Sequence, residues 1–432
     1  MLAREVGRSQ GFHRFETLPH GSTADAAKAS TVLSKIRLRL MSQDIRDFVT
    51  ASCDLLALGE PTHQEPAFAW VRNELFARLV DRGFRSIALE TDRVAALTVD
   101  DFVQRGVGTL DAAMGEGFSH GFGELDANRQ LVAWMRDYNE NRPAEERLAF
   151  HGFDVSTEMM SAPSPQRYLE HARDYLGIDL DLAALAGDEE RWSRTEAIMD
   201  PAMSVGATAE ADRLRSVADD MLTSLYARAP ELVAATSRAE WLRARTHLTA
   251  GLGLLRYHRQ AAVRLEQSAR ISLLSATRDA LMARNLLDIR GVEAHRGATL
   301  VFAHNLHLRR SLSTWRPADM DVSWYGAGAV VECLSDEQYT FVAGSLGRSE
   351  ALGLGEPEAG TYESSLQGRV TGWGLTTPTA VTSARTRTDT TPAQGYFPLD
   401  ETTLDAADAI LHISDGTTAA KSAQDGLRGL RA

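Results

Sequence analysis

The 432-residue chain has only two cysteines, Cys53 and Cys333. Two are too few for a disulfide framework and lack the paired spacing of a thiolate metal site, so nothing favours an oxidising compartment. No apolar run approaches 20 residues and the mean hydropathy is -0.24, which argues against a membrane span. The first 16 residues lack an apolar segment after their basic residues, unlike a secretion signal. We therefore expect a cytoplasmic protein with no membrane partner.

Positive charge is also scarce. Lys and Arg number 46 against 59 Asp and Glu, a net charge of -13, and such a surface repels phosphate backbones. Nucleic acid is therefore not an expected partner. No predicted strand is followed by G-x-S-x-G, G-x-G-x-x-G or G-x-x-x-x-G-K-[ST], so neither a serine nucleophile nor a nucleotide cofactor is indicated.

Four short apolar runs predict buried strands, at residues 54–59, 86–89, 148–150 and 299–303. Residues 66–82 between the first two predict a helix, because Phe68, Val71, Leu75 and Leu79 share one face and Gly83 follows as a stop. A strand, a helix and a strand form a βαβ unit, whose strands are parallel. The predicted fold class is α/β, with a mainly parallel central sheet flanked by helices.

Changes in composition predict four parts of the chain. Residues 1–45 are a polar lead-in, 46–162 the first part of an α/β core, 163–290 a helical insertion or lid, and 291–432 the second part of the core. The third part is rich in Ala, Leu, Arg and Glu, and we expect an all-helical subdomain over the carboxyl edge of the strands. Residues 330–334 and 339–346 then predict a β-hairpin, and 353–391 mostly loops.

Polar clusters follow each of the four predicted strands. In open α/β sheets the carboxyl ends of parallel strands gather loops from distant parts of the chain, so these clusters are expected to converge on one site. Histidine is scarce, 12 in 432 residues, yet four histidines lie in these clusters. The alternative is that charged residues follow strands because loops are solvated. The clusters comprise residues 59–63, 90–93, 151–154 and 304–307.

Particular roles follow from the residue types. His63 is a candidate general base that Glu60, three residues earlier, can orient. His304 and His307 are candidate donors to a carbonyl or oxyanion. Arg72 lies within the apolar stripe of its helix and is predicted to be buried, where it needs a carboxylate or ligand partner; Glu60, Glu90 and Asp154 are the candidates.

A rival interpretation makes Glu60, His63, His304 and His307 zinc ligands. Their spacing fits no known zinc signature, so no metal is expected. Other polar residues are candidate contacts to substrate, each weighed against a solvated or structural role. They are Glu90, Arg93, His120, Glu124 and Asp154.

At these positions the sequence resembles the erythromycin esterase family. The segments that carry the resemblance run in family order over about 250 residues, with a weaker match at 321–331. They are GEPTHQEPAFAWVRNEL (59–75), GFRSIALETD (83–92), ELDANRQLVAWMRDYN (124–139), FHGFDV (150–155), RDALMARNLL (278–287) and VFAHNLH (301–307).

The resemblance implies a metal-independent hydrolase in which a histidine activates water to attack an ester, as in macrolide resistance. It assigns the catalytic histidine to His63, its acidic partner to Glu60, the helix arginine to Arg72 and the paired later histidines to His304 and His307. Family members often carry small residues where this chain has Pro61, Gln64 and Leu306, which bears on substrate identity more than on chemistry.

Three functions are compatible with these residues. The first is hydrolysis of an ester or lactone of a small-molecule natural product, and the acidic chain favours an amine-bearing one. The second is proton-transfer chemistry in biosynthesis, such as elimination, isomerisation or cyclisation. The third is sequestration of a small molecule without turnover.

Overall fold

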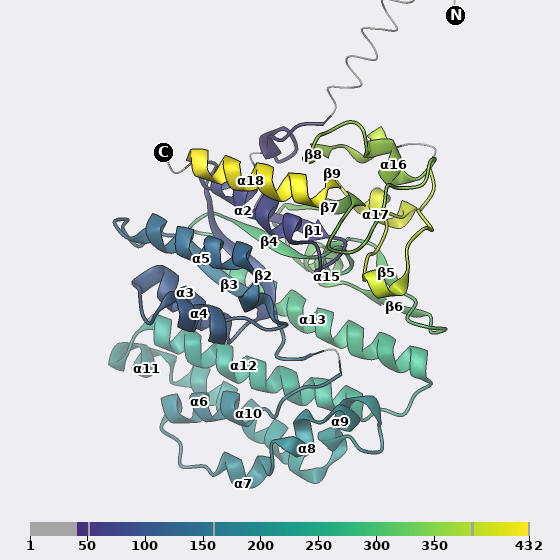
Figure 1. Cartoon of the computed structure of the whole chain (residues 1–432). Coiled ribbons are helices and arrows are strands. Elements are labelled where there is room, and N and C mark those ends of the chain that lie inside the picture. Colours follow the sequence, from purple (N-terminus) through teal and green to yellow (C-terminus); the bar gives the residue numbers. More distant parts are fainter. Residues whose placement is uncertain (1–40, 51, 159, 382–383, 431–432) are drawn as a thin grey trace, which may run out of the picture. The chain divides into compact units, whose positions relative to one another are not determined.

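The computed structural model describes residues 41–50, 52–158, 160–381 and 384–430 (Figure 1). These belong to one compact unit, Met41–Ala432. Of the predicted lead-in at 1–45, only residues 41–45 are described, and the short 3-10 helix η1 (Ile45–Asp47) begins at its last residue.

A seven-stranded sheet forms the centre of this unit, in the order β3-β2-β4-β1-β7-β9-β8. The four predicted strands are confirmed as β1 (Leu55–Glu60), β2 (Phe84–Asp92), β3 (Ala149–Asp154) and β4 (Ala298–His304). β7 (Tyr339–Arg348) and β9 (Ala409–Asp415) extend the parallel sheet, and β8 (Trp373–Thr376) pairs with β9 in the antiparallel direction. The predicted α/β class is thereby confirmed.

The register of β4 decides which residues meet at the carboxyl edge. β4 lies between β2 and β1, and Glu60 is the direct neighbour of His304. Just beyond, Asn305 exchanges hydrogen bonds with the Gly344 backbone, its Oδ1 and Nδ2 each 2.9 Å away. A Cβ on Gly59 would lie 2.1 Å from Asn305 Oδ1, so only glycine fits there.

Helices cover both faces of the sheet (Figure 1). α2 (Pro66–Val80) begins at Glu65, whose Oε1 accepts the Ala67 amide, with Pro66 in the first turn. It packs with α18 (Gly416–Leu430) and α5 (Asp126–Asn139) on the face that bears Leu56 and Leu58. α13 (Gln267–Glu293) and α15 (Ala327–Leu334) pack on the opposite face. The other elements outside the helical segment are α3 (Ala96–Arg105), α4 (Leu110–Glu116), η2 (Phe122–Glu124), α14 (Asn305–Leu308), β5 (Leu312–Trp315), β6 (Val322–Tyr325), α16 (Tyr362–Leu366), η4 (Pro378–Ala380), η5 (Pro392–Gln394) and α17 (Glu401–Ala406).

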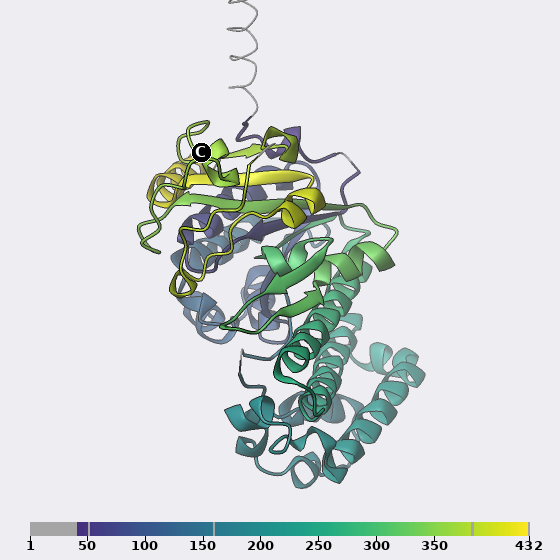
Figure 2. The same cartoon turned by 90° about the vertical axis from the view of Figure 1, so that its right-hand side faces the viewer.

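Between β3 and β4 the described residues form helices and no named strand (Figure 2). These helices bury a core of their own, which includes Trp192, Trp241 and Leu252. The proposed domain boundaries at 163 and 290 stay predictions. The elements before α13 are α6 (Gln166–Leu176), α7 (Leu182–Ala186), α8 (Glu190–Ser193), α9 (Thr195–Met199), η3 (Val205–Ala207), α10 (Ala209–Ala227), α11 (Ala229–Ala235) and α12 (Arg238–Ala261).

The predicted hairpin of residues 330–334 and 339–346 is wrong in its first half. Residues 339–346 form part of β7, but 330–334 belong to α15. The Ala327 amide in the first turn of α15 donates to Asp279 Oδ1 on α13 at 2.8 Å, a tertiary contact that local sequence does not encode. A short apolar run alone does not separate a strand from a buried helix. Residues 353–391 are mostly loops, as predicted, interrupted by the short elements α16, β8 and η4.

Among the residues that the structure describes, no helix combines the length and apolar character needed to cross a bilayer.

Candidate active site

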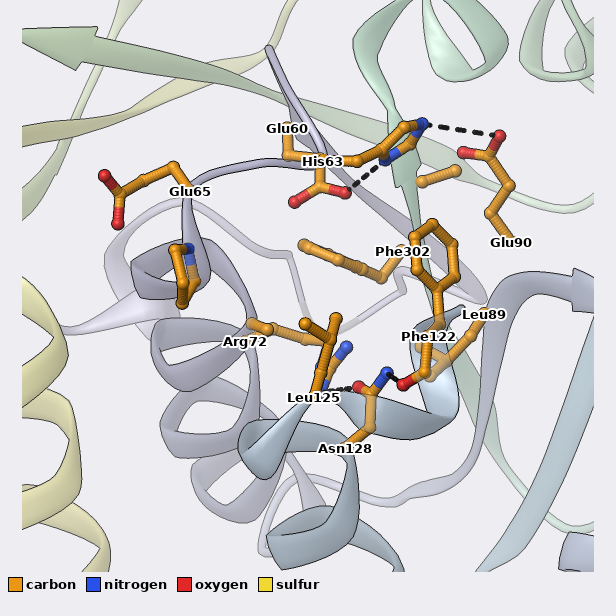
Figure 3. Close-up of a pocket in the computed structure, with 13 residues that line it drawn as sticks. Glu60, His63, Glu65, Arg72, Leu89, Glu90, Phe122, Leu125, Asn128 and Phe302 are labelled. Carbon is orange, nitrogen blue, oxygen red and sulfur yellow. Dashed lines mark hydrogen bonds and ion pairs between the residues drawn. The ribbon is translucent and has the colours of Figure 1, made fainter. Parts of the chain in front are cut away.

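A pocket lies at the carboxyl ends of β1, β2 and β4 (Figure 3). It holds about 410 Å³ of space, part of it open to solvent. The sheet contributes its floor, α2 one wall, and the segment around η2 and the start of α5 another. Its lining residues are Glu60, His63, Glu65, Pro66, Ala69, Arg72, Leu89, Glu90, Phe122, Leu125, Asn128, Phe302 and Ala303.

His63 and Glu60 form the pair that the sequence predicted. His63 Nδ1 lies 2.8 Å from Glu60 Oε1, and the His63 side chain is 36% exposed while that of Glu60 is 8% exposed. A carboxylate at Nδ1 fixes the tautomer in which Nδ1 carries the proton. His63 Nε2 is then the acceptor, and it faces Glu90 Oε1 at 3.8 Å (Figure 3).

The charges around His63 favour its protonated form. Burial opposes its charged form, but the carboxylates of Glu90 and Glu60 outweigh burial and raise the pKa of His63. Burial raises the pKa of Glu60, against the opposing effect of His63. His63 is therefore a stronger base than a free imidazole, and 36% of its side chain is exposed.

Glu90 at the end of β2 contacts three other groups of the site. Its Oε1 lies 3.2 Å from Arg278 Nη2 and 3.3 Å from His307 Nε2, and its Oε2 accepts the His304 amide at 2.9 Å. Burial disfavours the carboxylate, yet His307, His63 and Arg278 hold the pKa of Glu90 well below its usual range. Glu90 thus carries a fixed negative charge opposite His63.

The two later histidines differ in charge. Burial and nearby His63 lower the pKa of His304 to about 3, and its Nδ1 accepts the Leu306 amide at 3.3 Å, so His304 is neutral with a proton on Nε2. For His307 burial is outweighed by Asp279 and Glu90, which raise its pKa to about 10. Both His307 nitrogens face carboxylates, with Nδ1 2.8 Å from Asp279 Oδ1. Of these two histidines, His304 is the one with a ring nitrogen, Nε2, that is buried and has no hydrogen-bond partner among the described residues.

Arg72 is buried as predicted, with 1% of its surface exposed, but the prediction of a carboxylate partner is wrong. Its guanidinium donates to the amide oxygens of Asn73, at 2.6 Å, and Asn128, at 2.9 Å. Burial, partly offset by Glu60, lowers its pKa to about 9. It lies over the ring of Phe302, 4.9 Å from the centroid. Arg72 thus lines the pocket as a cation that makes no ion pair within the described residues.

The three carboxylates expected to pair with Arg72 are bonded to other residues, which explains why that prediction was wrong. Glu60 bonds His63, and Glu90 bonds Arg278 and His307. Asp154 at the end of β3 accepts from Arg278 Nε at 3.0 Å and contacts His120 Nε2 at 2.9 Å, so it anchors neither Arg72 nor Arg93.

His120 holds the loop that carries Phe122. Its backbone has a φ of +58°, which is strained for a residue other than glycine, and its Nδ1 lies 2.8 Å from Glu158 Oε2. Phe122 lies between two imidazoles, 5.3 Å from the His63 ring and 5.7 Å from that of His120. His120 therefore acts on the pocket through Phe122.

The His120 contacts predict a pH-dependent contribution to stability. Burial is outweighed by Asp154, which raises the pKa of His120 from 6.5 to about 8. The stabilisation is complete below pH 6.5 and is lost as the pH rises through about 8. We expect His120→Gln to lower the free energy of unfolding by on the order of 2 kcal/mol more in acid than in alkali. Denaturant titrations at both pH values measure this, and the exposed His295→Gln is the control. An equal loss at both would contradict the ion pair.

Two other predicted contacts lie away from the pocket lining. Arg93 contacts Asp288 at 3.5 Å and His151 at 3.2 Å, and it borders a smaller pocket beside Asp154 and α13. Glu124 in η2 is exposed, although its neighbours Phe122 and Leu125 line the pocket. Substrate-binding roles for Arg93 and Glu124 stay predictions.

Sequence reasoning missed several residues that complete the site. Arg278 and Asp279 on α13 bond Glu90, Asp154 and His307, and Asn128 on α5 holds Arg72. The only sequence signal for Arg278 and Asp279 was that they form a charged pair at the start of a helical segment that resembles the family. Among the described residues, no three His, Cys, Asp or Glu side chains are grouped as a metal site requires.

Comparisons with known proteins place these residues in a broader context. A family model described as erythromycin esterase matches residues 79–422, a stretch that excludes Glu60, His63 and Arg72. No curated protein matches the chain.

Three solved structures share the fold. A Bacillus cereus protein has 15% identity and a TM-score of 0.62, with 89% of this chain and 97% of that chain covered. A succinoglycan biosynthesis protein has 15% identity and a TM-score of 0.61, with 90% and 97% covered. A variant of the erythromycin esterase EreC in its open conformation has 17% identity and a TM-score of 0.61, with 88% and 96% covered.

Proposed function

The chain belongs to the erythromycin esterase family, and on that premise we propose that it is a hydrolase that opens a carboxylic ester or lactone of a small-molecule natural product. The observation that carries the proposal is the His63–Glu60 pair, whose acceptor nitrogen borders the pocket beside an ionised Glu90. An oriented imidazole of raised pKa is the group that ester hydrolysis by water needs.

The proposed reaction starts from a water molecule at His63 Nε2. The imidazole removes a proton while the water oxygen attacks the carbonyl carbon, and Glu60 and Glu90 stabilise the imidazolium that forms. The Arg72 guanidinium and the Nε2 proton of His304 stabilise the oxyanion. The tetrahedral intermediate then collapses, and His63 returns its proton to the leaving alkoxide. The products are a carboxylic acid and an alcohol, which in a lactone remain in one molecule.

The pocket supports a partly apolar substrate. Phe122, Leu125 and Phe302 offer apolar surface, while Glu60 and Glu90 bring negative charge next to it. These features are compatible with an amine-bearing natural product. A role in antibiotic resistance or in biosynthesis and a cytoplasmic location are part of the same proposal.

Hydrolysis in ¹⁸O-labelled water tests this function. Purified protein is incubated with macrolides, depsipeptides and simple lactones, and products are analysed by mass spectrometry. We expect one ¹⁸O atom in the product acid, with the rate unchanged by a chelator because His63 rather than a metal activates the water. An unlabelled product would instead support isomerisation or elimination, tight binding without product would support sequestration, and loss of activity with the chelator would contradict the metal-independent mechanism.

A further inference from the structure

Asp279 on α13 is a buried carboxylate with a complete set of partners. It is 1% exposed, and its two oxygens lie 2.8 and 3.0 Å from His307 Nδ1. Oδ2 also accepts from Trp324 Nε1 at 2.8 Å, and Oδ1 from the Ala327 amide at 2.8 Å. Asp279 therefore joins α13 to α14, β6 and α15 through one side chain.

The partner of Asp279 that contacts the pocket residue Glu90 is His307. Its ring is bonded to Asp279 through Nδ1, and its Nε2 is directed at Glu90 Oε1, 3.3 Å away. Both ring nitrogens face carboxylate oxygens, which favours the imidazolium and raises the pKa of His307 to about 10, although burial opposes the charge. Asp279 supplies the negative charge on the side of the ring remote from the pocket.

His307 in turn acts on the carboxylate opposite the proposed base. Acidic and basic side chains alternate in a series in which each contacts the next. The series is Asp279, His307, Glu90, His63 and Glu60. Arg278 and the His304 amide bond Glu90 from the side. The charged and titratable groups that face Glu90 and His307 from the packed elements are Glu60, His63, Arg278, Asp279 and His304.

We infer that Asp279 is a positioning residue for the proposed hydrolysis, which keeps His307 protonated and oriented so that Glu90 remains an ionised carboxylate opposite His63. This inference rests on the proposed function. Asp279 touches neither the pocket nor His63 directly. Its effect on the rate passes through His307 and Glu90, so it is expected in kcat rather than in KM.

The protonation state of His307 is measured by NMR on the full chain labelled at histidine, with the His307 signals assigned from His307→Gln. In the wild type we expect His307 to remain an imidazolium up to about pH 9. In Asp279→Asn it loses its proton at least about one pH unit earlier, because one of its two carboxylate partners is gone. The kcat for an accepted ester falls by about 10- to 100-fold, the range known for carboxylates that orient metal-bound histidines, with KM within about twofold.

Trp324→Phe is the matched control. The substitution removes the hydrogen bond from Trp324 Nε1 to Asp279 Oδ2 but keeps the Asp279 carboxylate and its contacts to His307. We expect this variant to retain the wild-type His307 titration and kcat. Equal losses of kcat in the two variants, or an unchanged His307 titration in Asp279→Asn, would overturn the inference.

The NMR titration of His307 in the wild type tests the role of Asp279 even if Asp279→Asn does not fold. A His307 that loses its proton near the ordinary value of 6.5 would show that Asp279 does not hold its charge. The titration needs no substrate. Absence of ester hydrolysis in the wild type would therefore refute the proposed function separately, while an unperturbed His307 refutes the role of Asp279.

Discussion

Replacing His63 with alanine is expected to lower kcat for an accepted ester by about 100- to 10,000-fold, the usual contribution of a positioned general base. His63 Nε2 is the acceptor that faces the pocket, while Nδ1 is bonded to Glu60. The side chain is 36% exposed, so its removal leaves no closed cavity and the thermal unfolding midpoint should change little. Initial rates and thermal unfolding of the purified variant measure both effects.

His295→Ala is the control for the His63 variant. His295 is an exposed histidine that does not line the pocket, so the kcat of this variant should equal that of the wild type. Because His63 is open to solvent, added imidazole is expected to restore part of the activity of His63→Ala. Wild-type turnover in His63→Ala would refute the proposed base.

Glu90→Gln is expected to reduce both stability and activity. The substitution leaves the half-buried Arg278 and the buried His307 against an amide, but Arg278 keeps Asp154 and His307 keeps Asp279, so we expect a loss of about 1–3 kcal/mol. It also removes the charge that stabilises protonated His63, so kcat should fall by about 100-fold. Denaturant unfolding and initial rates measure the two losses. The pKa of Glu90 is held well below 4.5, so the stability contribution is complete at neutral pH and is lost as the pH falls through that lowered value.

Glu74→Gln provides the comparison for Glu90. Glu74 is also a buried glutamate, 3% exposed, but it lies outside the pocket and its one ion-pair partner, Arg78, is 31% exposed. We expect a smaller loss of stability and no loss of kcat. Similar stability and kcat in Glu90→Gln and wild type would contradict the role of Glu90 as an ionised centre.

Local patterns predicted the elements that carry the candidate site. The four apolar runs became β1 to β4, and the polar residues after three of them, Glu60, Glu90 and His304, meet at one edge. This succeeded because a parallel sheet brings the carboxyl ends of its strands together whatever the chain distance. The burial of Arg72 followed from helical periodicity in the same way.

Contacts between distant elements were not predictable by the same means. Arg72 bonds amides because Glu60, Glu90 and Asp154 are already paired. Glu60 pairs locally with His63, but the pairing of Glu90 and Asp154 with Arg278 depends on where α13 lies. The start of α15 depends on Asp279 for the same reason. The hydrophobic periodicity of a segment shows which of its faces is buried. The partner of a buried charge depends instead on how that segment packs against other elements.

The position of β4 has a consequence for the order in which the protein acquires its chemistry. β4 is translated after β1, β2, β3 and the entire helical segment, yet it occupies the place between β1 and β2. A nascent chain that pairs β1 directly with β2 must separate them again before β4 can enter, and such non-local pairing is slow. The growing polypeptide therefore carries His63 and Glu90 before β4 is present to complete the sheet between their strands.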